Sequence, residues 1–403
     1  MNPAFSSFSV PREQWLTWKH LSMFPHRSTR KTGNPGAGRH SFFWARNALH
    51  HALCVLNVPR TGRALLPAYL CRAAAEPFAA YGLECDFYDI GRDCVLELGE
   101  VEAKLRPETR VLLAVHYFGF PQQIEALSKL CLTRNLLLFE DCAHVLPMNE
   151  NSIMFGMIGD ASVFSFRKFL PLFDGAELWL SKTKEFSWKA DRSRFNLQAA
   201  RFVASQTINS SSGLVARFAK NVIESFRSLR GSKSETSAEN TPTPEIVDNN
   251  SPSFDPTLLT QPMTNPSSWI LRHSTVASIA ARRRSNFTFL QKNLCLAPGV
   301  IPLFRELPQG VCPWVYPLFL DGIANAHLLL RSAGIPAVTW GGVRVGSISE
   351  AQYPGASFLY DNLVFLPVHQ NLSNEHLQTI VDVVRKVGSD CRKLHGRGTN
   401  AID

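Results

Sequence analysis

Short apolar segments alternate with helical segments through the middle of the chain, and this alternation limits the folds that the chain can adopt. Most of these segments are apolar throughout and are too short to be buried helices. Strands that are hydrophobic on both faces occur in parallel sheets with helices packed on both sides. The predicted strands cover residues 63–67, 84–90, 110–116, 135–139 and 161–166, and the predicted helices cover residues 45–57, 70–81 and 124–134. The sequence therefore predicts an α/β fold with three α/β/α layers and a mostly parallel sheet.

Composition divides the chain into four parts. Residues 1–40 are a loop-rich N-terminal arm, and residues 41–228 contain the alternating pattern of a large domain. Residues 229–262 are rich in Ser, Thr, Asn and Pro with few large apolar side chains, which predicts a flexible polar insertion or linker. Residues 263–395 return to a mixture of strands and helices and are predicted to form a smaller C-terminal α+β domain.

The charge and cysteine content narrow the classes of function. The net charge is +9, but the basic residues occur in short clusters without the interleaved aromatic side chains that stack on nucleic-acid bases. We therefore expect a solvated surface, or attraction of an anionic substrate, rather than a nucleic-acid partner. The chain contains 9 cysteines without a CxxC pair, which predicts free thiols, no metal site and a cytoplasmic location. The sequence contains neither an apolar stretch that would span a membrane nor a secretory signal pattern.

Polar side chains follow two of the predicted strands. Asp141 follows the strand at 135–139, and Ser165 and Lys168 lie at the end of the strand at 161–166. Ligands of parallel sheets bind beyond the carboxyl ends of the strands. Pyridoxal phosphate needs a lysine amine for its aldehyde, a carboxylate for its ring nitrogen and hydrogen-bond donors for its phosphate. The sequence therefore predicts a pyridoxal-phosphate site in which Lys168, Asp141 and Ser165 supply these groups.

Each of these residues also has an ordinary structural interpretation. An aspartate after a strand is often a helix cap, a lysine near a strand end is often a solvated charge, and a serine there can cap a turn. The order and spacing of the three along the chain favour the cofactor site over these alternatives.

Residues 111–147 resemble the core of the DegT/DnrJ-type aminotransferase family, whose members are fold-type-I pyridoxal-phosphate enzymes that mostly aminate keto-sugars attached to nucleotides. The family pattern is a strand, His-x-Tyr-Gly-x-Pro, a helix, and an apolar strand that ends in Glu-Asp-x-Ala-Gln or His. The positions that match it are His116, Gly119, Pro121, Glu140, Asp141, Ala143 and His144. The resemblance covers residues 38–180 and returns over residues 269–388.

The resemblance implies roles for individual residues. Lys168 would bind the cofactor covalently, Asp141 would pair with its ring nitrogen and His144 would contact its phenolic oxygen, so these three are the expected catalytic residues. Ser165 would bind the phosphate.

The first helix of the pattern implies further cofactor contacts. Arg46 and Asn47 lie at its start, where the family holds the phosphate with backbone amides, and a helix N-terminus there suits an anion. Tyr69 is a candidate for stacking on the cofactor ring, although an ordinary buried aromatic residue explains it equally well.

Four further residues are candidates for substrate contacts. His116 and Tyr117 lie at a strand end that faces the same crevice, and Trp340 lies in a segment that resembles the substrate side of the family. His369 follows a predicted strand near the C-terminus. Each also has a purely structural interpretation as the end of a strand or part of a turn.

The chain departs from the family pattern around its lysine. Lys168 follows Ser165 by three positions rather than five, and Asp174-Gly175-Ala176 stands where the family has a Gly-Gly pair. We prefer Lys168 to Lys182 and Lys184, which lie in a more polar stretch. These departures also allow a catalytically inactive scaffold or regulator as an alternative function.

The resemblance implies an aminotransferase that moves an amino group from an amino acid donor to a keto-sugar. Related dehydratases have histidine in place of the lysine, so Lys168 argues against dehydration. Family members usually build each site across a dimer interface, which implies a homodimer.

Overall fold

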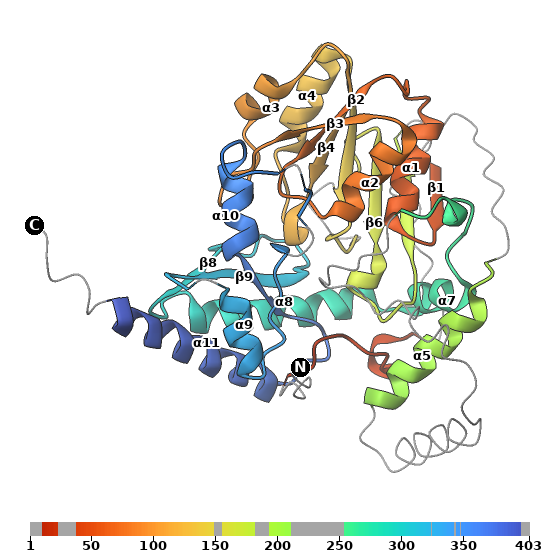
Figure 1. Ribbon diagram of the computed structural model, residues 1–403. Helices are drawn as coiled ribbons and strands as arrows, with labels where there is room; N and C mark the ends of the chain where they lie inside the picture. The colour runs from red at the N-terminus through yellow and green to blue at the C-terminus, as the bar shows by residue number, and fades with distance from the viewer. Residues whose placement is uncertain are drawn as a thin grey trace, which may run out of the picture.

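The protein consists of a large α/β domain and a smaller α+β domain packed beside it (Figure 1). The structure is a computed structural model, and it describes residues 10–22, 38–148, 155–181, 193–210, 254–323, 325–341, 344–346 and 348–395. None of the helices formed by these residues is long and apolar enough to span a membrane.

The large domain contains a seven-stranded sheet in the order β1-β7-β6-β5-β4-β2-β3. The strands β2 to β6 are parallel to one another along the sheet, and β7 is antiparallel to both of its neighbours, β6 and β1. The strands are β1 (Gly38–Phe42), β2 (Arg63–Pro67), β3 (Glu84–Tyr88), β4 (Thr109–Val115), β5 (Leu137–Cys142), β6 (Ala161–Ser165) and β7 (Ala176–Leu180). This confirms the predicted, mostly parallel sheet.

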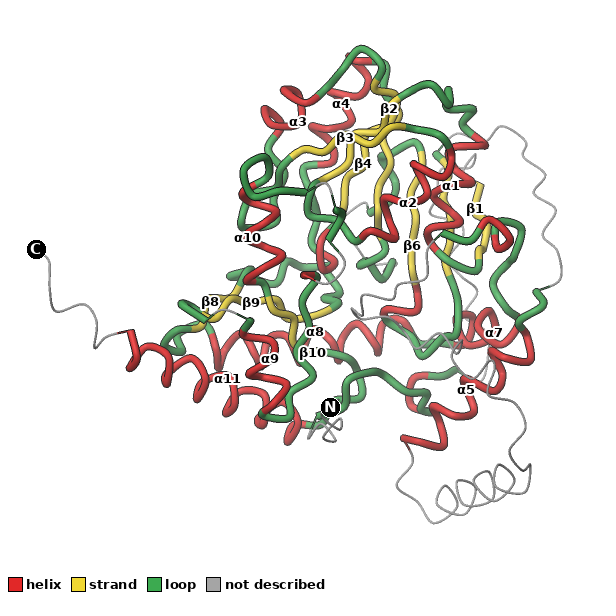
Figure 2. Tube along the Cα trace, in the orientation of Figure 1, coloured by secondary structure: helices red, strands yellow, loops and turns green. Residues whose placement is uncertain are grey.

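Helices cover both faces of this sheet (Figure 2). Helices α1 (Ala45–Val55) and α2 (Arg72–Tyr81) pack against each other on one face, while α3 (Leu98–Lys104) and α4 (Ile124–Arg134) lie on the other. Right-handed crossovers between parallel strands place the helices in this way. The α/β/α layering is therefore confirmed.

The sequence patterns missed several elements at the edges of the sheet. Strands β1 and β7 were not predicted because their polar and apolar residues are mixed, as in the GRHSF of β1, which also begins inside the predicted N-terminal arm. Strand β5 extends past Phe139 through Glu140 and Asp141, which are paired in register with Ala114 and Val163 on its neighbours. Glu140 and Asp141 are therefore part of the strand itself, near its carboxyl end.

The small domain is built on a three-stranded antiparallel sheet in the order β10-β9-β8. Its strands are β8 (Val300–Pro302), β9 (Val315–Leu320) and β10 (Val364–Pro367), and its helices are α8 (Val276–Leu294), α9 (Ala326–Ser332), α10 (Pro354–Asn362) and α11 (Asn374–His395). Helices α8 and α11 pack on each other beneath the sheet. This confirms the predicted α+β unit.

Side chains of the large domain bind the first turn of α10 and thereby join the two domains. The Asp89 carboxylate, just after β3, accepts hydrogen bonds from the backbone amides of Gly355 (2.8 Å) and Ala356 (2.8 Å). The Tyr360 hydroxyl of α10 accepts from the amide of Leu70 (2.9 Å). The domains are therefore fixed to each other beyond the ends of β2 and β3.

The predicted flexible segment 229–262 lies only partly within the described residues. From Phe254 onward it is ordered: Phe254 stacks on His50, Leu258 is buried, and the carbonyl oxygen of Gln261 accepts from the amide of Phe43 (3.1 Å). These three residues therefore pack against the large domain, and the flexibility of the segment stays a prediction. A short 3-10 helix, η4 (Pro256–Leu258), lies here.

Asp174, in the Asp174-Gly175-Ala176 stretch that stands where the family pattern has a Gly-Gly pair, anchors the following helix to the large domain. Its buried carboxylate accepts from the backbone amide of Thr264 (2.6 Å), the hydroxyl of Thr264 (2.6 Å) and the hydroxyl of Ser267 (2.5 Å), at the start of α7 (Asn265–His273). Helix α7 packs on α5 (Asn196–Ser210). The departure from the family pattern thus has a structural role.

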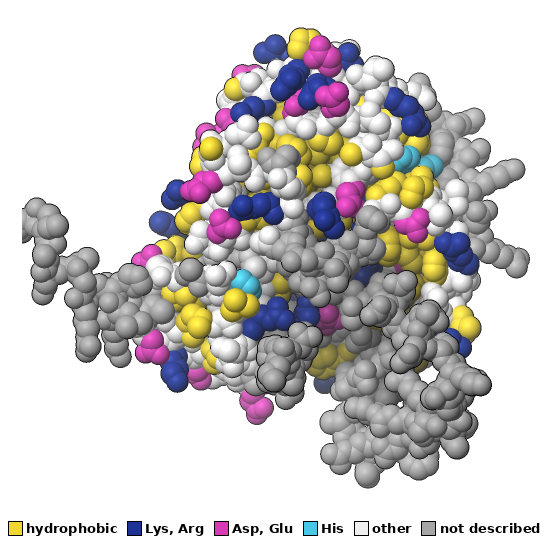
Figure 3. Space-filling model, viewed as in Figure 1, with side chains coloured by type: hydrophobic (Ala, Val, Ile, Leu, Met, Phe, Trp, Pro, Cys, Tyr) yellow, Lys and Arg dark blue, Asp and Glu magenta, His cyan; other side chains and the backbone are white. Residues whose placement is uncertain are grey.

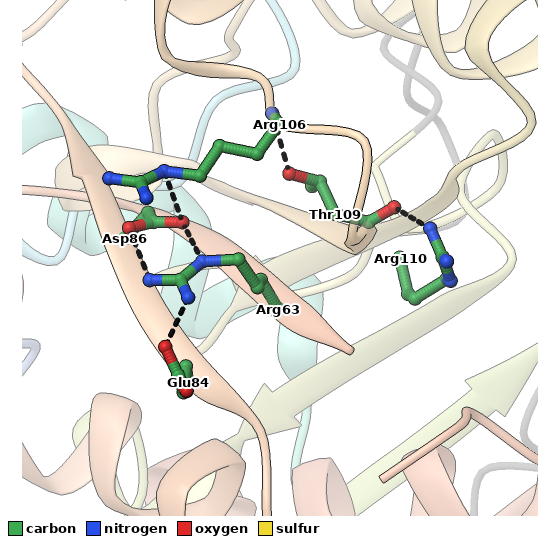
Figure 4. Close-up of polar contacts among 6 residues, drawn as sticks. All are labelled: Arg63, Glu84, Asp86, Arg106, Thr109 and Arg110. Carbon is green, nitrogen blue, oxygen red and sulfur yellow. Dashed lines mark hydrogen bonds and ion pairs between the residues drawn. The ribbon is translucent and has the colours of Figure 1, made fainter. Parts of the chain in front are cut away.

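A network of charged side chains lies toward the amino-terminal ends of β2 and β3 (Figure 4). Arg63 of β2 binds both carboxylate oxygens of Asp86 on β3 (2.5 and 2.9 Å) and also pairs with Glu84. Arg106 adds a second cation at 3.4 Å from Asp86. Basic and acidic side chains are also interspersed on the face over α3 and α4 (Figure 3).

Asp174→Ala should lower the free energy of unfolding by about 2–4 kcal/mol, because three buried donors lose a common acceptor. Asp255→Ala is the matched control: it removes only the exposed cap of η4, a bond to the amide of Thr257 (2.9 Å), and should cost about 0.5–1 kcal/mol. Urea unfolding of the full chain measures both values. Equal losses in the two variants would show that Asp174 does not anchor α7.

Candidate functional site

A pocket lies between the two domains at the carboxyl ends of β4, β5 and β6. Its lining includes Val115, Asp141 and Ser165 at these strand ends, together with Lys168 just beyond β6. Because β4, β5 and β6 are parallel, their carboxyl ends meet at this one edge, as expected for ligand sites in such sheets. The structure thus brings together the three residues that the sequence predicted as the centre of the site.

Lys168 lies on the short 3-10 helix η3 (Phe166–Lys168) that follows β6. Its ammonium nitrogen lies 4.7 Å from the centre of the Trp314 ring, and Asp141 lies within range of its charge. Burial lowers the pKa of Lys168 from 10.5 to about 8, against the opposing effect of Asp141. Roughly a tenth of an amine with this pKa is neutral at pH 7, compared with less than a thousandth of an ordinary lysine.

Asp141 is buried, with 7% of its surface exposed. Burial raises its pKa, although the charge of Lys168 and a hydrogen bond from the backbone amide of Ala143 (2.8 Å) act in the opposite direction. Its carboxylate therefore faces the pocket with part of its hydrogen-bonding capacity free to bind a polar ligand.

His144 packs against two aromatic rings. It stacks on Trp314, with ring centres 4.3 Å apart, and on Phe118 at 5.8 Å. Its Nδ1 accepts a hydrogen bond from the amide of Phe118 (3.2 Å), so the proton of the neutral ring lies on Nε2. Burial and the charge of Lys168 lower the pKa of His144 well below its usual value. His144 is therefore a neutral donor at the pocket wall.

Glu140 supports the site from behind and does not line it. Its buried carboxylate accepts from the amides of Gly156 (2.9 Å), Ile158 (3.0 Å) and Gly159 (2.6 Å), and lies 3.0 Å from Nε2 of His116. Burial alone would raise its pKa, but the bonds from His116 and the amides lower it.

His116, Glu140 and Cys142 lie within 4.8 Å of one another by their potential ligand atoms. Since the Glu140 carboxylate is already occupied by three amides and His116, we assign this group to the framework and not to a metal.

The N-terminus of α1 forms another wall of the pocket. Trp44, Ala45 and Arg46 line it, and the cap residue Trp44 makes no side-chain capping hydrogen bond. Asn47, in the same turn, is 1% exposed, and neither atom of its side-chain amide has a hydrogen-bond partner among the residues that the structure describes. First-turn amides and a helix dipole favour an anion at this place.

Tyr69 and Tyr117 lie outside the residues that line the pocket. The hydroxyl of Tyr117 donates to the backbone oxygen of Tyr69 (2.6 Å), and both rings are buried beside Trp340. Leu70 and Cys71, the next residues along the chain, line the pocket instead. His116 is likewise buried behind the wall, paired with Glu140.

Trp340 and His369 do line the pocket, as does the N-terminal segment that includes Gln14. Nε2 of His369 binds the backbone oxygen of Pro11 (3.1 Å), and burial lowers the pKa of His369 to about 3. His369 is therefore neutral at physiological pH.

Sequence reasoning missed several lining residues, above all Trp314, Arg283 and Gln14. They come from the small domain and from the N-terminal arm, and no local motif marks them. Trp314 stands at the start of a predicted strand of the small domain, and this position is the one sequence signal that could have identified it.

The α/β fold predicted from the sequence, with a seven-stranded and mostly parallel sheet, is confirmed. Residues 44–175 match the DegT/DnrJ/EryC1/StrS aminotransferase family. The resemblance stated from the sequence is thus confirmed for the segment that contains Asp141, His144, Ser165 and Lys168.

Curated relatives match about a third of the chain. A GDP-perosamine synthase of Vibrio cholerae is 30% identical over 120 residues, which are 30% of this chain and 33% of the relative. A UDP-N-acetyl-3-dehydro-alpha-D-glucosamine 3-aminotransferase of Acidithiobacillus ferrooxidans is 28% identical over 121 residues, again 30% of this chain and 33% of the relative. The aligned region thus spans about a third of the length of these relatives.

The likeness in fold extends over nearly the whole chain. The PLP form of a putative sugar aminotransferase, Spr1654 of Streptococcus pneumoniae, superposes with a TM-score of 0.64 at 16% identity and covers 97% of this chain and 99% of that one. At this identity the likeness concerns the fold alone.

The residues present fit pyridoxal phosphate. The pocket offers an amine with a lowered pKa, a carboxylate beside it, and a helix N-terminus with an adjacent serine for a phosphate. Asn47, in that first helical turn, is buried and does not itself line the pocket. The three requirements of the cofactor are therefore met within one pocket.

Asp141→Asn should lower the pKa of Lys168 below its value of about 8, because the carboxylate stabilises the charged amine. The pH dependence of reductive methylation of Lys168, measured by mass spectrometry of its peptide, gives this pKa, since only the neutral amine reacts. Asp382→Asn, on the exposed side of α11, is the control and should leave the pKa unchanged. An unchanged or raised pKa in Asp141→Asn would show that the Asp141 carboxylate does not stabilise the charged amine of Lys168.

Proposed function

We propose that the protein is a pyridoxal-phosphate-dependent aminotransferase that moves an amino group from an amino acid donor to a keto-sugar. The observation that carries the proposal is the placement of half-buried Lys168 and buried Asp141 on the wall of one pocket beside the N-terminus of α1. The family match and the sugar-modifying relatives support the reaction class.

Each residue then has a defined task. Lys168 would hold the cofactor, Asp141 would keep a proton on the ring nitrogen, and Ser165 with the amides of α1 would bind the phosphate. Bound pyridoxal phosphate supplies an electron sink for the carbanion at the amino-bearing carbon of the substrate.

Lys168 has a second task in proton transfer. With a pKa of about 8, its amine can both accept and return a proton near neutral pH. The Nε2–H of neutral His144 faces the same pocket and can donate a hydrogen bond to a ligand oxygen without adding a charge.

The acceptor class follows from the charges and rings of the pocket. Arg12, Arg46 and Arg167 line it, which favours an acceptor with anionic phosphates such as a nucleotide-linked keto-sugar. Trp314 and Trp340 offer apolar ring faces on which the sugar can pack. We further propose that the protein acts in the cytoplasm as a homodimer, in line with its free thiols and with the usual assembly of such enzymes.

Lys168→Ala should abolish covalent attachment of the cofactor. After borohydride reduction, mass spectrometry of the digested wild-type protein should locate a pyridoxyl group on Lys168, and the visible absorbance of the bound cofactor should vanish in the variant. Lys292→Ala, on the exposed side of α8, should retain both signals. A pyridoxyl group on another lysine, or on none, would refute the assignment.

The holoenzyme should convert its cofactor to the aminated form when mixed with glutamate or glutamine, because an aminotransferase completes this half-reaction without an acceptor. Loss of the visible band on mixing measures the conversion. An inactive scaffold would bind the cofactor and show no conversion with any common amino donor, and that result would overturn the proposed activity.

A further inference from the structure

The backbone turn that carries Lys168 is held by three long side chains from distant parts of the chain. The Gln14 side-chain amide donates to the carbonyl oxygens of Arg167 (3.0 Å) and Leu170 (3.3 Å). Arg283 donates to the carbonyl oxygen of Lys168 itself (3.3 Å). Gln370 donates to that of Phe169 (2.9 Å). Four consecutive carbonyl oxygens thus receive donors from outside the turn.

Arg283 connects these side chains to one another. Its guanidinium also binds the side-chain oxygens of Gln370 (3.0 Å) and Gln14 (3.4 Å) and the backbone oxygen of Trp314 (3.0 Å). It is 1% exposed, and among the described residues it forms no ion pair with a carboxylate.

A buried guanidinium without a carboxylate is a poor general stabiliser. Its desolvation is costly, and an apolar side chain of similar volume often stabilises a core as well or better. What Arg283 provides in particular is several donors in a fixed plane, directed at oxygens around Lys168 and Trp314. These oxygens would otherwise lack partners in a buried turn.

The geometry of the turn explains why it needs such support. Helix η3 is only three residues long. The backbone amides of Phe169 and Leu170, which follow it, both donate to the same carbonyl oxygen, that of Phe166. The carbonyl oxygens of residues 167–169 therefore receive hydrogen bonds from side chains elsewhere, whereas that of Leu170 also accepts from the backbone amide of Leu172 (2.8 Å). The backbone from which the lysine side chain projects is set by these contacts.

We propose that Arg283, Gln14 and Gln370 are positioning residues that fix the amine of Lys168 in the pocket by binding the carbonyl oxygens of residues 167–170. The inference rests on the proposed function, in which Lys168 is the reactive amine. It assigns to the N-terminal arm and to α8 a direct part in placing that amine.

The test uses variants of the full chain that remove hydrogen-bond donors either with or without a change of charge. Gln14→Leu and Gln370→Leu remove donors without changing any charge, Arg283→Lys retains the charge with fewer donors, and Arg283→Met removes both. Gln291→Leu is the matched control on α8, because Gln291 also forms two side-chain hydrogen bonds, to Arg305 and Tyr316, far from Lys168.

Two measurements read the position of the amine. The first is the rate at which cofactor-stripped protein, given pyridoxal phosphate, forms the borohydride-trapped adduct on Lys168. The second, made without cofactor, is the pH profile of Lys168 methylation. We expect the adduct rate to fall about tenfold in the glutamine variants and up to roughly 100-fold in Arg283→Met, the range typical of a misplaced reactive group. The methylation midpoint should move upward from about 8 as the amine becomes more solvated.

The outcomes separate the inference from the proposed function. If the wild-type protein forms no adduct, the proposed function fails, and the methylation profiles alone decide the positioning role. If Gln14→Leu and Gln370→Leu keep both the wild-type rate and the wild-type midpoint, as Gln291→Leu should, the proposal is overturned. Because these two variants carry no charge change and remove few contacts, the decision does not depend on folding of Arg283→Met.

Discussion

The pair of opposite charges at the carboxyl edge of the sheet, buried Asp141 and half-buried Lys168, is the constraint on which the rest of the site depends. An ammonium and a carboxylate removed from water are stable only with closely matched surroundings. Here Asp141 is held by the amide of Ala143, and Lys168 lies over the ring of Trp314. Parallel strands supply this edge, and the small domain closes it. The architecture and the chemistry therefore follow from the same strand directions.

Sequence patterns predicted the elements whose periodicity is local. The strands at 63–67 and 161–166, the helix at 124–134 and the placement of Asp141 and Lys168 in one pocket follow from apolar runs and from the polar residues that end them. Strands β1 and β7 escaped prediction because each is short and mixed in composition, and antiparallel pairing between them fixes their place.

The rest of the site could not be predicted because it is assembled from residues that are distant in the sequence. Arg283 and Gln14 acquire their roles only when α8 and the N-terminal arm meet the turn after β6. Tyr69 shows a different limit, since the sequence located the correct loop but not which of its residues faces the pocket: Tyr69 is buried and Leu70 lines the wall. Local patterns do not specify the direction of a side chain in an irregular segment.

The contact between Asp89 and α10 has a consequence for motion. A hinge that swung the small domain away from the sheet would pull the amides of Gly355 and Ala356 off the Asp89 carboxylate, and would also break the bonds of Tyr360 to the loop after β2. Several such bonds broken together make wide opening rare. Access to the interior must then come from rearrangement of side chains and short segments, with the two halves of the molecule moving as one body.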